Sequence, residues 1–90
     1  MSDEKQDLEV KRRESLKQFR DKRVELAQTQ RKLDQDLNRL IMDEIASEEL
    51  EAFLATVEEE YRLMIQKLDE LKRSLDLYSF YLRQWFRKRK

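Results

Sequence analysis

The 90-residue chain contains no glycine, proline, cysteine or histidine. Without cysteine and histidine, disulfides, zinc sites, haem ligation and histidine acid–base chemistry all lose the residues they need. Without glycine, a phosphate-cradling loop cannot be built, and tight turns lose their most permissive residue. These absences argue against most enzyme classes, so we expect a protein that is not an enzyme and that holds no cofactor or metal.

Long hydrophobic segments are missing as well. No apolar run exceeds four residues, as at Ala52–Ala55, which is far too short to cross a bilayer. The first ten residues are acidic and lack the apolar core of a signal peptide. We therefore expect a soluble, cytoplasmic protein, and the lack of cysteine fits a reducing compartment.

Charge and moderate hydrophobicity are what the chain does contain. It has 20 Lys+Arg and 20 Asp+Glu, 44% charged residues and 39% hydrophobic residues. This is too polar for a compact globule and too rich in leucine and aromatics for a disordered tail, which favours a coiled coil or an elongated helical bundle in a single domain, residues 1–90. The charge is segregated, with +2 on residues 1–40, −8 on 41–70 and +6 on 71–90.

Apolar residues in the second half of the chain alternate in steps of four and three, which is typical of a long amphipathic helix with a heptad seam. We place this helix at about residues 47–88. The seam residues are Leu50, Leu54, Val57, Tyr61, Met64, Leu68, Leu71, Leu75, Tyr78, Leu82 and Trp85.

A weaker seam in the first half predicts another helix, which ends at about residue 42 and whose first twelve residues we expect to fray. Its members are Leu16, Phe19, Arg23, Leu26, Gln30, Leu33, Leu37 and Leu40. We interpret the polar seam residues Arg23 and Gln30 as setting the register of the coiled coil. The alternative is that they mark where a third helix docks.

The phases of the two seams do not join, which predicts a chain reversal in a turn near residues 43–47. Ser47, followed by Glu48 and Glu49, has the pattern of a helix N-cap with acidic residues in the first turn. The expected fold is all-α, a two-helix antiparallel coiled-coil hairpin. One continuous helix in a parallel coiled-coil dimer is the alternative.

Arms of similar length suggest which residues face each other across such a hairpin. Facing positions should add up to about 90 in residue number. The expected pairs are Leu40 with Leu50, Leu33 with Val57, Leu26 with Met64, Phe19 with Leu71 and Leu16 with Leu75.

Possible catalytic groups lack the surroundings that catalysis needs. Acidic residues cluster at 48–51 and 58–60, but a two-helix coiled coil offers no desolvated pocket to separate their pKa values, so we interpret them as a solvated acidic face. The serines Ser15, Ser47, Ser74 and Ser79 have no histidine to activate them.

Aromatic residues crowd the end of the second helix, opposite polar positions near Arg12, Glu9 and Lys5. Aromatics without an intramolecular partner are typical of an interface, and we interpret this set as a partner-binding patch. In the alternative, Leu8 and Val10 fold over them and they merely close the hairpin. The patch comprises Tyr78, Phe80, Tyr81, Leu82, Trp85 and Phe86.

The sequence thus predicts an interaction protein that self-associates, or that scaffolds or chaperones a helical protein partner, through its terminal aromatic end. Basic residues at the same end allow another function, contact with nucleic acid or an anionic membrane. The candidate anionic contacts are Arg83, Arg87, Lys88, Arg89 and Lys90, together with Lys11, Arg12, Arg13, Lys17 and Arg20.

Overall fold

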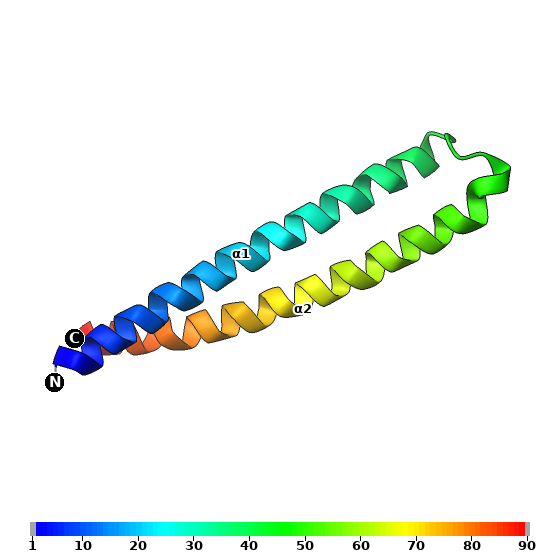
Figure 1. Cartoon of the computed structure of the whole chain (residues 1–90). Helices are drawn as coiled ribbons and strands as arrows, with labels where there is room; N and C mark the ends of the chain where they lie inside the picture. Colours follow the sequence, from blue (N-terminus) through cyan, green and yellow to red (C-terminus); the bar gives the residue numbers. More distant parts are fainter. Residues whose placement is uncertain (1, 90) are drawn as a thin grey trace.

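The chain folds into two long helices that lie side by side and run in opposite directions, with the ends of the chain together at one end of a rod (Figure 1). A computed structural model describes residues 2–89, in the order α1 (Ser2–Ile41), η1 (Ser47–Glu49) and α2 (Leu50–Arg89). The rod measures 68 × 17 × 15 Å. The predicted all-α antiparallel hairpin is confirmed. Neither described helix is long and apolar enough to cross a membrane.

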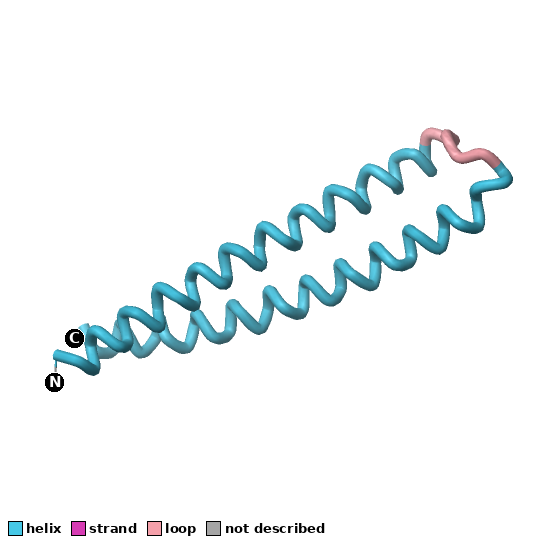
Figure 2. The backbone as a smooth tube through the Cα atoms, in the orientation of Figure 1, coloured by secondary structure: helices cyan, strands magenta, loops and turns pink. Residues whose placement is uncertain are grey.

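Helix α1 ends in a Schellman-type turn built without glycine. The Glu44 amide donates to the Arg39 carbonyl over 3.0 Å, and the Asp43 amide donates to the Leu40 carbonyl over 3.2 Å. Asp43 takes the left-handed position with φ 58°, a conformation in which aspartate is tolerated better than most residues. This turn falls at the predicted place, between the two helices (Figure 2).

The second helix begins with a single 3₁₀ turn at Ser47–Glu49 before α2 proper. Ser47 lies inside this turn, whereas the cap position belongs to Ala46, whose backbone is extended and whose carbonyl accepts from the Glu49 amide over 2.9 Å. No side chain caps this end. The predicted Ser47 N-cap is therefore wrong by one residue, while Glu48 and Glu49 do occupy the first turn.

The opening residues are helical from Ser2 onward, although their sequence predicted fraying. Pairs of opposite charge three and four residues apart run along this segment, joining Lys11 to Asp7 and both Arg12 and Arg13 to Glu9. Such pairs stabilise a helix. Helix α1 therefore extends alongside the last turns of α2.

Each helix of the rod presents two heptad rows to the other. On α2 the predicted row Val57, Met64, Leu71, Tyr78 and Trp85 faces α1, and we call it the central row. The second buried row is polar for most of its length and consists of Phe53, Glu60, Lys67, Ser74 and Tyr81. The predicted second seam row of α2 lies outside this contact, on the other flank of the central row.

On α1 too, the second buried row lies one position before the row that the sequence predicted. Its second buried row contains Ser15, Lys22, Thr29 and Asp36, and the predicted register residues Arg23 and Gln30 are exposed. Small side chains explain why this row is buried, because Ser15 and Ser74 are almost fully buried and let the backbones of the two helices approach. Their hydroxyls donate to carbonyls of their own helices, so that no polar group is left unpaired there.

One aromatic contact between the helices differs from the predicted pairing. Phe19 stacks on Tyr78, with ring centroids 6.2 Å apart and planes inclined by 12°, although Leu71 was its expected partner. Tyr78 lies one heptad further along α2 than Leu71. The ion pairs of Lys22 with Glu70 and of Glu25 with Lys67, by contrast, join positions that add up to 92, close to the expected sum.

Candidate interaction surface

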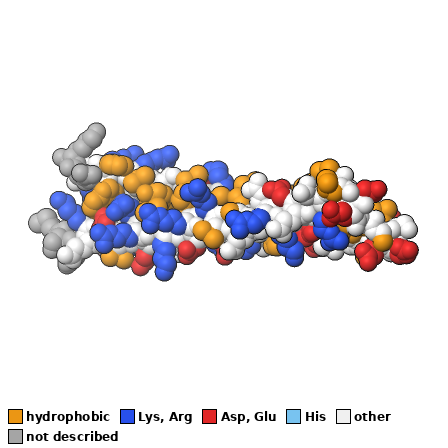
Figure 3. All heavy atoms as spheres, turned by 90° about the horizontal axis from the view of Figure 1, so that it is seen from above, with side chains coloured by type: hydrophobic (Ala, Val, Ile, Leu, Met, Phe, Trp, Pro, Cys, Tyr) orange, Lys and Arg blue, Asp and Glu red, His pale blue; other side chains and the backbone are white. Residues whose placement is uncertain are grey.

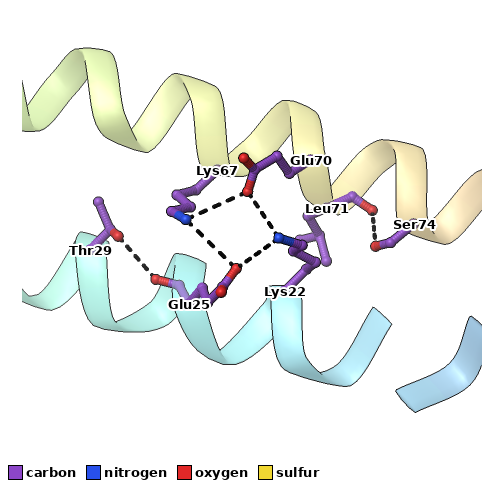
Figure 4. Close-up of polar contacts among 7 residues, drawn as sticks. All are labelled: Lys22, Glu25, Thr29, Lys67, Glu70, Leu71 and Ser74. Carbon is purple, nitrogen blue, oxygen red and sulfur yellow. Dashed lines mark hydrogen bonds and ion pairs between the residues drawn. The ribbon is translucent and has the colours of Figure 1, made fainter. Parts of the chain in front are cut away.

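Four charged side chains link the helices halfway along one side of the rod (Figure 4). The Lys22 ammonium lies 3.3 Å from both Glu25 and Glu70, and the Lys67 ammonium lies 3.7 Å from Glu25 and 3.5 Å from Glu70. Two of these ion pairs cross between α1 and α2. We call Lys22, Glu25, Lys67 and Glu70 the charge quartet, and it closes this side of the interface with polar groups.

Ion pairing within the charge quartet shifts the pKa values of two of its members, Lys22 and Glu70. Hydrogen bonding to Glu25 and then to Glu70 raises the pKa of Lys22. Partial burial by itself would raise the pKa of Glu70, but the hydrogen bond and charge of Lys22, with help from Lys67, lower it overall. Lys22 and Glu70 are therefore held in their charged forms, which suits an ion pair that fixes the relative position of two helices.

Nearer the turn, the rod buries a carboxyl group that lacks such compensation. Glu60 is 7% exposed, and among the described residues neither of its oxygens has a hydrogen-bond partner. Burial, and then the neighbouring Asp36, raise the pKa of Glu60 to about 7, while Lys32 acts in the opposite direction. Two carboxyl groups brought together in this way retain a proton more readily than either would alone.

An apolar row of α2 stays uncovered along the length of the rod. Tyr61 is 42% exposed, Leu68 55% and Leu75 38%, and the rows beside them add the exposed Ile65. Leu54 and Leu82 at the two ends are half-buried. We call Leu54, Tyr61, Leu68, Leu75 and Leu82 the leucine row.

The leucine row and the charge quartet lie on opposite sides of the rod. The quartet occupies the flank of the polar row, whereas the leucine row follows the other flank of the central row. In an antiparallel pair, equivalent flanks of the two helices border the same side, so the row of α1 that carries Leu16, Arg23, Gln30 and Leu37 lies beside the leucine row. The result is a long face with apolar side chains and no ion pair across it among the described residues.

Sequence reasoning placed the leucine row inside the seam and so missed it as a surface. A signal was present, because Arg23 and Gln30 are poor cover for the expected partners Leu68 and Tyr61. The functional interpretation of these two polar residues, that they mark a site where a further helix docks, stays a prediction.

The terminal aromatics fall into two groups. Tyr78, Tyr81, Leu82 and Trp85 are half-buried, whereas Phe80 and Phe86 are 54% and 52% exposed. Phe80 contacts the edge of Tyr81, with centroids 5.3 Å apart. The exposed part of the predicted patch consists of these two phenylalanines, and its role in binding a partner stays a prediction.

Residues near the start of α1 cover part of the aromatic patch, which is the alternative that the sequence did not favour. The Arg12 guanidinium lies 5.1 Å from the centre of the Trp85 ring, and its hydrogen bonds to Glu9 lower the pKa of that carboxyl. Leu8 lines a small hollow together with Lys5, Trp85 and Lys88. Val10, the other expected cover, is itself half exposed.

Basic residues dominate this terminal end, and acidic residues the turn end (Figure 3). Residues 1–23 and 71–90 together carry 15 basic and 7 acidic side chains, a net +8, and residues 24–70 carry 5 and 13, a net −8. Arg83 and Arg87 are exposed, and Lys88 pairs with Glu4 over 3.5 Å. Arg89 ends α2, and Lys90 lies outside the described residues.

Comparison with known proteins adds no relative: no family model, curated protein or solved structure matches the chain. Among the described residues, no group of three or more acidic side chains is placed to hold a metal ion. The long apolar face and the charge asymmetry are thus the features on which a function can be argued.

Proposed function

We propose that this protein is a non-enzymatic helical interaction module, which self-associates or scaffolds a helical partner by packing helices against the leucine row. The observation that carries the proposal is the uncovered leucine row itself. A repeat of apolar residues every seven positions is the pattern by which helices recognise one another. The exposed Phe86 extends the docking surface at the terminal end, whereas Phe80 lies on the other flank beside Tyr81.

The small core of the rod supports the same proposal. Among the described residues, Leu33 and Val57, 3% and 6% exposed, are the only hydrophobic residues that are fully buried. Covering one Leu or Tyr side chain fully contributes on the order of 1.5–3 kcal/mol, and a small domain is stable by only about 5–15 kcal/mol. Binding of a helix along the leucine row would therefore add a large part of the total stability.

Photo-crosslinking in the cells that produce the chain tests this proposal. A photoreactive amino acid replaces Leu68 in one variant and Val24 in another, two side chains that are both 55% exposed. We expect adducts with a polypeptide from position 68 and few or none from position 24, which points away from the leucine row. Equal yields at the two positions, or no adduct at either, would contradict the proposal.

The net +8 of the terminal half favours a second candidate, electrostatic contact with nucleic acid or an anionic membrane. Such binding weakens steeply as salt is added. Retention of the purified protein on duplex DNA and on phosphatidylserine vesicles, at low and moderate salt, measures it. The matched control is a variant with Arg83 and Arg87 replaced by glutamine. If the unchanged protein is not retained at low salt, this candidate is ruled out.

A further inference from the structure

We propose that the occupant of the apolar face is a second copy of this chain, packed face to face with its long axis reversed, so that two hairpins form an antiparallel four-helix bundle. This inference rests on the proposed function and names the partner. It follows from three properties of the face: the symmetry of its side chains, the distribution of charge and its size.

The leucine row reads the same in both directions. Its members are spaced by seven residues on either side of Leu68, with Tyr61 and Leu75 next to the centre and Leu54 and Leu82 at the ends. A two-fold axis through Leu68, perpendicular to the rod, places Leu68 against Leu68 of the second copy. It also places Tyr61 against Leu75 and Leu54 against Leu82, so every position of the row meets an apolar one.

The matching row of α1 has the same symmetry. A face-to-face arrangement with reversed axes stacks α1 on the α1 of the second copy. Leu16 then meets Leu37 and Arg23 meets Gln30. The two arginines do not face each other, and the glutamine side-chain oxygen can accept a hydrogen bond from the guanidinium. One axis therefore satisfies both rows, because Leu68 and the midpoint of the α1 row both lie near the middle of the rod.

Charge selects this orientation over the parallel one. Reversal lays the half with net +8 over the half with net −8 of the other copy, at both ends of the assembly. A two-fold axis along the rod would instead bring the two +8 halves together and the two −8 halves together, which like-charge repulsion disfavours. All neighbouring helices in the reversed arrangement are antiparallel, as in bundles with short loops.

The size of the face is sufficient for a stable dimer. A surface 68 Å long and 15 Å wide covers about 1,000 Å² on each copy, or about 2,000 Å² in total, which reaches the range of permanent homodimers. A two-fold dimer also uses the same patch on both partners, which is the commonest form of self-assembly.

The oligomeric state provides the first test. Sedimentation equilibrium of the full chain at micromolar concentration should give twice the mass of 11.2 kDa. Leu68→Glu should raise the dissociation constant at least 100-fold while circular dichroism stays helical, because Leu68 is more than half exposed in the single hairpin. The control is Leu63→Glu, a leucine of similar exposure (43%) on the flank away from the leucine row, and it should leave the dimer intact.

Single cysteines test the orientation, since the chain has none of its own. Leu68→Cys should be joined to its copy by a short bis-maleimide. Tyr61→Cys alone should react poorly, because two copies of residue 61 would lie about 21 Å apart along the bundle at 1.5 Å per residue. A mixture of Tyr61→Cys and Leu75→Cys should crosslink again.

Spin labels at Glu44→Cys, beside the turn, give an independent distance. In the reversed dimer the two labels should be separated by nearly the 68 Å length of the rod, whereas a parallel dimer would bring them together. A monomer at all concentrations, a dimer that survives Leu68→Glu, or short distances between the turns would each overturn the inference. Photo-adducts at position 68 that contain a different protein would overturn it while upholding the proposed function.

Discussion

Glu60 of α2 is buried beside Asp36 of α1, and the two carboxyl groups meet without a hydrogen-bond donor to either Glu60 oxygen among the described residues. Lys32 is the cation whose charge acts on Glu60. A buried acid without compensation makes the stability of the rod depend on pH.

The pKa of Glu60 is raised from an ordinary value of 4.5 to about 7, so the folded protein binds more protons than the unfolded chain between these values. Stability should therefore fall as pH rises from about 5 to about 8, by at most about 1.4 kcal/mol per pH unit for one proton. Glu60→Gln should remove this slope and stabilise the protein at pH 8. Urea unfolding at fixed protein concentration measures both, and an unchanged slope in the variant would assign it to another group.

The rings of Phe19 in α1 and Tyr78 in α2 stack across the interface between the helices. A double-mutant cycle with Phe19→Leu and Tyr78→Leu should give a coupling energy of about 0.5–1.5 kcal/mol. The same cycle on Phe19 and Leu77, an exposed neighbour of Tyr78, should give none. Stronger coupling of Phe19 to Leu77 than to Tyr78 would contradict the pairing.

The charge quartet should make the contact between the helices sensitive to salt. Glu70→Gln removes the carboxylate that both Lys22 and Lys67 approach, so it should lower the melting temperature at 20 mM salt. The loss should shrink at 1 M salt, where the Debye length is only about 3 Å. Asp69→Asn, which breaks an exposed pair with Arg73 on the same helix, is the matched control and should have a smaller effect at both salt concentrations.

Asp43 holds the left-handed position of the turn, which costs a non-glycine residue about 1–2 kcal/mol. Asp43→Gly should relieve part of this cost, offset by the greater freedom of glycine in the unfolded chain, so we expect a net gain of up to about 1 kcal/mol. Asp43→Val should destabilise the hairpin, because a β-branched residue tolerates this conformation poorly. Thermal unfolding measures both, and a more stable valine variant would contradict the turn geometry.

Several parts of the fold could be predicted from particular residues. The steps of four and three from Leu50 to Trp85 indicate a helix, and the phase break near Met42 indicates the reversal. The left-handed Asp43 could not be foreseen, since without glycine the chain had several polar residues that could take that position. The length of α1 was underestimated because local charge pairs, rather than apolar residues, continue it to Ser2.

The candidate surface was harder to predict. The aromatic end was identified from composition, but Arg12 and Leu8 cover part of it. This cover depends on side-chain contacts, such as the Arg12 guanidinium over the Trp85 ring, that spacing alone does not reveal. The leucine row was recognised as an apolar repeat, but it was placed in the buried seam, whereas most of it is exposed in the structure. Its exposure depends on which flank of α2 meets α1.

By itself, the sequence determined two amphipathic helices, the reversal between them and the central row, because a seven-residue repeat of apolar side chains favours one face whatever it packs against. Only the tertiary structure decided which neighbouring row completes the contact. On α2 one flank is apolar and the other holds Glu60, Lys67 and Ser74, and hydrophobicity alone favours the apolar flank. The small Ser15 and the cross-helix pairing of Lys22 with Glu70 make the polar flank fit α1 instead, which leaves Leu68 and its row uncovered.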